Sequence, residues 1–254
     1  LPPCWTRCAP PLPAPKQRLL IVNVFYPPQD IGGATRVVQD NVRDLLRLYG
    51  DQYEIDVITT LEGGETAYQV GCHARDGARI WTITARNGIG TMDVRDHRMG
   101  DVFDRLLDRI RPDLVHLHCI QRLTASVVDK LRYRAVPYVI TLHDGWWVSP
   151  NQFVVSPEGV PETYRFDAVD KPVPDRARIT RRALESAAAV LAVSESFADL
   201  HRTAGIDGVE TVENGVSALA ERRFVPGPSG RVRLGLIGGA SRHKGYALLR
   251  AAIH

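Results

Sequence analysis

The chain has 254 residues, of which 44% are hydrophobic and 24% charged, the composition of a globular protein with a core of its own. Its 32 basic and 29 acidic residues leave a formal charge of +3, too small to indicate a nucleic-acid-binding protein. No apolar run of the sequence reaches the roughly 20 residues of a membrane helix. The 4 cysteines are dispersed without the spacing of metal ligands, so the sequence predicts reduced thiols in a cytoplasmic protein.

Beyond a proline-rich segment, residues 1–17, which is expected to be a disordered linker, strand and helix signals alternate. A glycine-rich, hairpin-like segment lies between the second and third strand signals. The alternation predicts a doubly wound, Rossmann-like α/β fold with a parallel sheet and right-handed crossovers. Strands are expected at 19–25, 54–60, 79–84, 113–118, 136–142, 189–194 and 209–212, and helices at about 37–49, 101–112, 124–134, 175–189 and 195–204.

The domain organisation follows from the distribution of proline and glycine. Residues 18–216 are expected to form one complete domain, and residues 217–230 read as a linker between domains. A new strand at 231–239 opens a second α/β domain, of which residues 231–254 supply the first βα unit. One such unit cannot bury a core of its own, so the sequence predicts a complete domain followed by an incomplete one.

The loop after the first predicted strand contains Gly32 and Gly33 directly before a helix. Ligands of doubly wound sheets bind beyond the carboxyl ends of the strands, where the amides at helix N-termini are available. Two consecutive glycines let those amides approach a phosphate closely, and the helix dipole adds a favourable potential. The alternative is an ordinary glycine-rich turn.

The loop after strand 136–142 begins with His143 and Asp144 and continues into Trp146 and Trp147. A histidine at a strand end can donate to a sugar hydroxyl or a carbonyl, and the carboxylate can orient it or cap the loop. The alternative is a histidine with a purely structural role. The two tryptophans are interpreted as the wall of a cleft, since the CH faces of sugars pack on indole rings, with a place in the core as the alternative.

A third candidate loop, at 238–249, leads from two glycines through Lys244 into an apolar helix. It resembles a phosphate-binding entry to a helix, although it has neither the Walker A nor the G-x-G-x-x-G spacing, and the alternative is a solvated basic turn. The sequence contains no D-x-D motif, which argues against a metal-dependent nucleotide-sugar site.

In this order, the motifs PPQDIGGATR, DLVHLH, VITLHDGWW, AVLAVSES, VENGV and GGASRHKG resemble those of the retaining glycosyltransferases of family 4. The resemblance runs from about residue 18 to the C-terminus and implies the two-domain GT-B fold. It implies an acceptor-side N-terminal domain and a C-terminal domain that binds a nucleotide-diphosphate sugar as co-substrate, with no further cofactor and no metal. The implied reaction is transfer of a hexose with retention to a glycan or lipid-linked glycan, in bacterial polysaccharide biosynthesis.

The resemblance also implies roles for individual residues. Gly32 and Gly33 would face the donor diphosphate, and His143 would contact the transferred sugar. Lys244 would neutralise the diphosphate leaving group, a role that suits a compact ammonium. The cleft that receives the acceptor and the sugar would include Arg36, His118, Asp144, Trp146 and Trp147.

Two departures from the family pattern affect these expectations. Gly239 stands where the pattern G-R-L-x-x-x-K-G has arginine, and Arg242 is the candidate substitute. The acidic E-x7-E motif of the family would lie beyond residue 254, so the chain by itself is expected to be inactive. The competing interpretation is a non-catalytic module that binds a carbohydrate or a nucleotide sugar. An NAD-dependent oxidoreductase fits poorly, because no G-x-G-x-x-G follows the first strand.

The predicted helix at 175–189 carries several arginines beside a few apolar residues, a weakly amphipathic basic face. It predicts at most a peripheral contact with the inner face of the cytoplasmic membrane. A solvated face on a helix that covers the sheet is the preferred interpretation.

Overall fold

The computed structural model describes residues 15–29, 31–156, 158–166, 174–216, 234–237 and 244–253. The chain divides into two compact units, residues 1–215 and 216–254. The described part of the second unit contains the helix α6 (Tyr246–Ala252). Arg242 and Gly239, which the sequence placed in the third candidate loop, lie outside the described residues.

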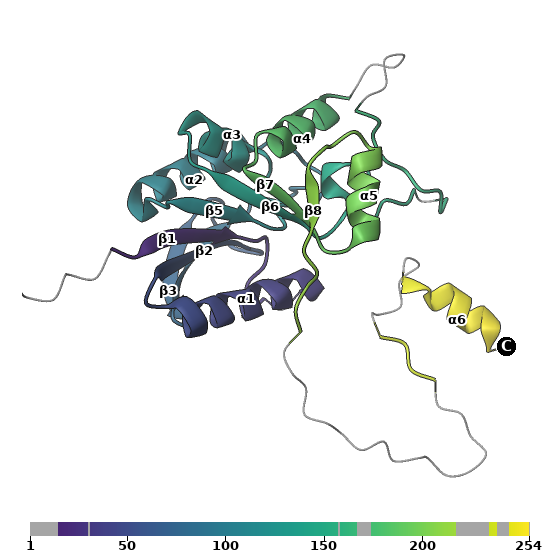
Figure 1. Ribbon diagram of the computed structural model, residues 1–254, viewed down its shortest axis with the longest axis horizontal. Helices are drawn as coiled ribbons and strands as arrows, with labels where there is room; N and C mark the ends of the chain where they lie inside the picture. Colours follow the sequence, from purple (N-terminus) through teal and green to yellow (C-terminus); the bar gives the residue numbers. More distant parts are fainter. Residues whose placement is uncertain are drawn as a thin grey trace, which may run out of the picture. The chain divides into compact units, whose positions relative to one another are not determined.

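Strands and helices alternate along the first unit, as the sequence predicted (Figure 1). In chain order the described elements are β1 (Gln17–Val22), α1 (Gly33–Tyr49), β2 (Tyr53–Leu61), β3 (Val70–Arg75), β4 (Ala78–Thr84), α2 (His97–Ile110), β5 (Leu114–Leu117), α3 (Ser126–Tyr133), β6 (Tyr138–Leu142), the 3-10 turn η1 (Gly145–Trp147), α4 (Asp175–Glu185), β7 (Ala189–Ala192), α5 (Glu195–Thr203) and β8 (Val209–Thr211).

The strands form one sheet in the order β3-β4-β2-β1-β5-β6-β7-β8. Every neighbouring pair is parallel except β3 and β4. The chain builds the sheet in one direction from β1 through β2 and in the other from β5 through β8. The order therefore reverses between β1 and β5, and such a reversal opens a crevice at the carboxyl ends of the strands where α/β proteins bind ligands.

Several elements differ from the sequence expectation. In the expected strand at 231–239, the described residues 234–237 are not in a strand. The hairpin-like segment contributes a full edge strand, β3, which pairs antiparallel with β4. Asp76 and Gly77 join the two strands with φ angles of 53° and 85°, the left-handed pair that a two-residue hairpin turn requires. Helix α2 begins at His97 rather than near residue 101, because the Asp96 side chain caps it by accepting the N–H of Met99 at 3.0 Å.

Helices cover both faces of the sheet, which makes it the predicted doubly wound, Rossmann-like sheet. Figure 1 shows α1 on one side of the sheet and α2, α3 and α4 on the other. In β1, Leu20 and Val22 enter the cluster under α2 and α3, whereas Ile21 packs with Val38 of α1. This alternation is what a strand buried on both faces requires.

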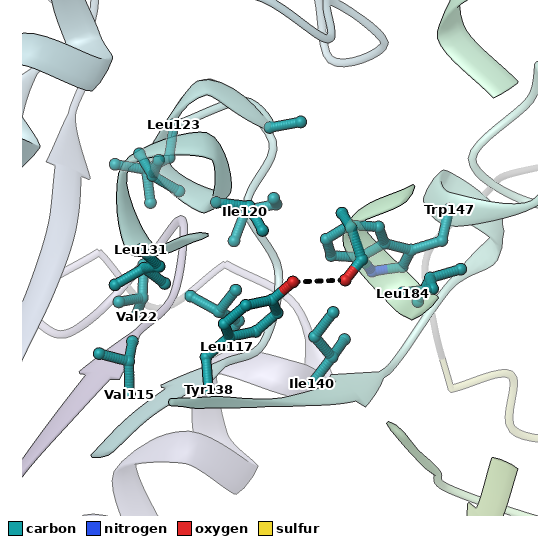
Figure 2. Close-up of a cluster of buried hydrophobic side chains, with 14 of the residues drawn as sticks. Val22, Val115, Leu117, Ile120, Leu123, Leu131, Tyr138, Ile140, Trp147 and Leu184 are labelled. Atoms are coloured by element: carbon teal, nitrogen blue, oxygen red, sulfur yellow. Dashed lines mark hydrogen bonds between the residues drawn. The ribbon is translucent and has the colours of Figure 1, made fainter. Parts of the chain in front are cut away.

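The larger cluster ties the helices to the central strands (Figure 2). Tyr138 at the start of β6 donates its hydroxyl proton to the carbonyl of Ala183 in α4 at 2.6 Å. The neighbouring Leu184 is 2% exposed. Among the described residues, no helix is long and apolar enough to span a membrane.

Candidate functional site

The carboxyl ends of β1, β5 and β6 lie side by side, and the loops that leave them are joined by hydrogen bonds. Asn23, directly after β1, accepts the N–H of Cys119 at 3.1 Å and donates to the carbonyl of Phe25 at 2.6 Å. Val24 donates its N–H to the carbonyl of Cys119 at 2.6 Å. Strand β1 therefore ends at Val22 rather than at residue 25, because the next residues bind the loop of β5. These hydrogen bonds hold the loops after β1 and β5 together at the point where the strand order reverses.

The N-terminus of α1 opens onto this edge of the sheet. Gly32 caps the helix with φ 83° and ψ 161°, and it offers no side chain to the amides of the first turn. A Cβ placed on Gly32 or Gly33 would meet nothing within 4 Å. Arg36 follows within the first helical turns and is exposed. A helix N-terminus without a side-chain cap among the described residues, a helix dipole and open space are the features that accommodate a phosphate.

His143 is the first residue after β6 and is partly buried, so its position at a strand end is as the sequence predicted. Its Nε2 atom lies 2.9 Å from Nδ1 of His118, within hydrogen-bonding distance. Burial lowers the pKa of His143 to about 4, so its ring is neutral at neutral pH. A neutral imidazole with one nitrogen engaged by a neighbour has one nitrogen left for a ligand.

His118 lies behind His143 rather than in an open cleft, and the expectation of a cleft residue is wrong on this point. Its side chain is 2% exposed, because the second histidine of HLH turns toward the sheet between two other rings. The ring centroids are 4.1 Å from His116 and 5.2 Å from His143. His116 in turn contacts Oγ1 of Thr141 through Nε2 at 2.7 Å. Burial lowers the pKa of His118 far below its usual value.

Asp144 organises the loop instead of facing a ligand. One carboxylate oxygen accepts the N–H of Trp146 at 3.0 Å and so caps η1. The other accepts the side-chain amides of Gln121 at 2.8 Å and Gln152 at 2.7 Å. Burial raises the pKa of this carboxyl, while the hydrogen bonds act in the opposite direction. The expectation of a cleft contact is replaced by the capping role that the sequence left as an alternative.

Trp146 and Trp147 do not wall a cleft, and that prediction is wrong. They are 1% and 2% exposed and belong to the main core cluster, where Figure 2 shows Trp147 among the packed side chains. The two rings meet edge to face with centroids 5.0 Å apart, and Nε1 of Trp146 donates to the carbonyl of Thr91 at 2.8 Å. η1 turns both indoles inward, where they bury more apolar area than any other side chain could.

A residue that the sequence did not single out for this loop, Arg176 of α4, holds it from the far side. Its guanidinium lies 4.5 Å above the ring of Trp146 and donates to that residue's carbonyl at 2.6 Å and to the carbonyl of Met92 at 3.1 Å. The apolar residues beside it, Ala183 and Leu184, are buried in the core. Helix α4 thus covers the sheet, and its apolar residues are not available to a membrane.

Lys244 lies in the second unit, exposed, directly before Gly245 and α6. Its role in neutralising the diphosphate leaving group stays a prediction. Among the described residues, no group of three or more His, Cys, Asp and Glu side chains could hold a metal ion.

The model of one protein family, glycosyltransferase family 4, matches residues 31–218, well over half of the chain. No curated protein matches the sequence. The solved structures similar to this chain include the catalytic domain of starch synthase IV from Arabidopsis thaliana bound to ADP and acarbose. The match has 15% identity and a TM-score of 0.49, and it covers 79% of this chain and 52% of the starch synthase chain.

Two further structures match at similar levels. The HepE protein of Anabaena in complex with UDP has 15% identity and a TM-score of 0.42 over 79% of this chain and 44% of that one. Sucrose-phosphate synthase from Thermosynechococcus elongatus has 14% identity and a TM-score of 0.45 over 79% of this chain and 90% of that one. This chain therefore spans about half the length of the starch synthase and HepE chains that it matches.

Proposed function

Since this chain belongs to glycosyltransferase family 4, we propose that it is the acceptor-side part of an enzyme that transfers a hexose from a nucleotide-diphosphate sugar to a glycan or lipid-linked glycan. The transfer retains the anomeric configuration, needs no metal, and belongs to bacterial polysaccharide assembly in the cytoplasm. The observation that supports the proposal most directly is the N-terminus of α1, which has no side-chain cap among the described residues and lies at the reversal of strand order, with His143 two strands away on the same edge.

The roles that we propose for these residues follow from their charge. The amides of Gly33 and the residues after it offer partial positive charge to the donor diphosphate, and the helix dipole adds to it. Lys244 of the second unit, and Arg242 beside it, supply full positive charge to the leaving group, which carries more negative charge as the bond to the sugar breaks. His143 donates a hydrogen bond to the transferred sugar. Peripheral attachment to a membrane would rest on exposed arginines such as Arg178, since the apolar side of α4 is buried.

Gly33→Ala tests the phosphate role with little risk to the fold. The new methyl group meets no atom within 4 Å, and Gly33 does not have the positive φ of Gly32, so the unfolding temperature should not fall. The same methyl group would stand where a phosphate approaches the amides. In the full-length protein, a nucleotide-diphosphate sugar at a hundredfold excess over Kd should stabilise the wild type by about 2.7 kcal/mol and so raise its melting temperature. The same ligand should raise the melting temperature of the variant far less.

Product analysis then separates the enzyme from the alternative. With the donor that stabilises most, mass spectrometry should detect a hexose added to the acceptor, and NMR should show an anomeric configuration unchanged from the donor. Stabilisation without any product would favour the non-catalytic binding module. A Gly33→Ala variant that is stabilised as strongly as the wild type would contradict the placement of the diphosphate.

A further inference from the structure

Three imidazole rings lie in a row at the carboxyl edge of β5 and β6. His116 pairs with Ile21 in register, so its side chain lies on the face of the sheet that α1 covers. His118, two residues on, lies on the same face, and its ring stands between those of His116 and His143. Of the three residues, His118 is buried, whereas His116 and His143 are partly exposed, and His143 is the one that directly follows a strand end. The middle ring is therefore the one that decides how the last ring is held.

The hydrogen-bonding options of the middle ring are few. Nδ1 of His118 faces Nε2 of His143 at 2.9 Å. Nε2 of His118 is fully buried and has no partner among the described residues. Burial lowers the pKa of both rings, so each is neutral and carries one N–H at neutral pH. The bond between them can run in either of two directions.

The two directions have different costs. If His143 donated, the proton of His118 would sit on Nε2, as a buried N–H without an acceptor. If His118 donates from Nδ1, its Nε2 keeps only an unpartnered lone pair. Orphaned buried N–H groups are the rarer of the two in folded proteins. The second direction is favoured, and it leaves Nε2 of His143 as the acceptor and Nδ1 as the nitrogen that carries the proton.

We propose that His118 is a positioning residue whose Nδ1–H donates to Nε2 of His143 and fixes His143 in the Nδ1–H tautomer. His143 then presents a hydrogen-bond donor to the open edge and has no lone pair there with which to act as a base. The ligand atom it selects is an oxygen acceptor. The identity of that atom as a sugar oxygen rests on the proposed function, whereas the tautomer does not.

The tautomer can be measured without any substrate. Histidine-selective ¹⁵N labelling of the whole chain, with His143 assigned by its absence from the spectrum of His143→Gln, distinguishes protonated from unprotonated ring nitrogens at pH 7.5. The expected spectrum has a protonated Nδ1 and an unprotonated Nε2 for both His143 and His118. A protonated Nε2 on His143 would overturn the proposal.

Variants of His118 test whether it causes the tautomer. His118→Phe keeps a ring in the row but removes the donor, so His143 should no longer be held in one tautomer. His118→Asn keeps an N–H donor close to the position of Nδ1 and should restore the wild-type spectrum of His143. His201→Phe is the matched control, because His201 is 0% exposed and also has a buried Nε2 without a partner, but it lies on α5. An unchanged His143 spectrum in folded His118→Phe would refute the positioning role.

Kinetic constants of the full-length protein add a measurement that a loss of stability alone would not change. His118→Phe should lower kcat about tenfold, the value of one net hydrogen bond, with KM for the acceptor unchanged, and His118→Asn should recover most of it. If His118→Phe does not fold, the ¹⁵N spectra of the wild type and of His118→Asn still test whether His143 has the proposed tautomer. A full-length protein with the expected tautomer but no transferase activity would refute the proposed function and leave the positioning role of His118 intact.

Discussion

The buried histidines predict an unusual loss of stability in mild acid. Burial lowers the pKa of His116, His143 and His201 to about 4, against 6.5 for a free histidine, and it also lowers the pKa of His118 well below that free value. A group whose folded-state pKa is depressed contributes stability above its unfolded pKa and loses it as the pH falls toward the folded value. The unfolded chain binds protons at these sites from about pH 6.5 downward, whereas the folded chain does so only near pH 4.

The magnitude follows from the titration of the unfolded chain between pH 7.5 and pH 5.5. With a free pKa of 6.5 and a folded pKa two or more units lower, each histidine costs about 1.4 kcal/mol over this interval. The three histidines with a folded pKa of about 4 give an upper value of about 4 kcal/mol, reduced where a ring is partly exposed, and His118 adds to the fall. For a domain of this size, that corresponds to a melting temperature lower by about 10–20 °C.

The titration of carboxylates contributes little to the change in stability between pH 7.5 and pH 5.5. Hydrogen bonds from Lys130 and Arg134 lower the pKa values of Asp101 and Asp108 below 3.8. The pKa of Asp76 is also lowered, because the hydrogen bond from Gln39 and the nearby arginines outweigh burial. The stability that these carboxylates add is lost only below about pH 4. Burial raises the pKa of the Asp144 carboxyl instead, so this group destabilises the fold at high pH and that destabilisation diminishes as the pH falls. The histidines therefore dominate the slope between pH 7.5 and pH 5.5.

The assay is urea unfolding at pH 7.5, 6.5 and 5.5, followed by tryptophan fluorescence, since both tryptophans of the β6 loop are buried. His201→Phe should reduce the fall in unfolding free energy by about 1.4 kcal/mol, one histidine's share, whatever its effect at pH 7.5. A wild-type protein whose unfolding free energy is equal at the two ends of the range would refute the reasoning. The histidines would then not be held neutral by burial.

Three further predictions concern the same edge of the sheet. Asp144→Ala leaves the donors of Trp146, Gln121 and Gln152 unpaired and should lower the free energy of unfolding in urea by about 3 kcal/mol. The control Asp175→Ala removes a side chain that is 83% exposed and should change the same free energy by less than about 0.5 kcal/mol. Equal effects would contradict the role of Asp144. His143→Ala in the full-length enzyme should lower turnover about 10²–10³-fold with a nearly unchanged fold, and a destabilised but fully active variant would end the catalytic assignment. In flotation with anionic vesicles the protein should stay in the soluble fraction, because the apolar side of α4 is buried; recovery with the vesicles would refute this.

The fold was largely predictable because its signals are local. Fully buried parallel strands appear as continuous apolar runs, and 19-LLIVNVF-25 and 136-VPYVITL-142 became β1 and β6 near the centre of the sheet. Boundaries set by side chains were less predictable. Asp96 starts α2 four residues early through its bond to Met99, and a single aspartate before a helix does not identify itself as a cap in the sequence.

The site was predictable only in its positions along the chain. The ends of parallel strands meet at one edge, so the sequence could place Gly32, Gly33 and His143 there. It could not say how deeply a side chain is buried once its strand has ended. His118 lies on the same face as His116, two residues before it, but no pattern in 113-DLVHLH-118 indicates that it is buried behind His143.

The loop after β6 shows why residue types alone did not identify its ligand-facing atoms. Histidine, aspartate and tryptophan are each common in sugar sites, yet here the two indoles fill the core and the carboxylate fixes η1. Those three contacts have one consequence in common, which is that they fix the backbone directly after His143. A donor that must meet one oxygen of a bound sugar gains from such rigidity, because little conformational entropy is left to lose when the bond forms. The side chains that were expected to touch the sugar therefore contribute to the site by fixing the position of the one that can.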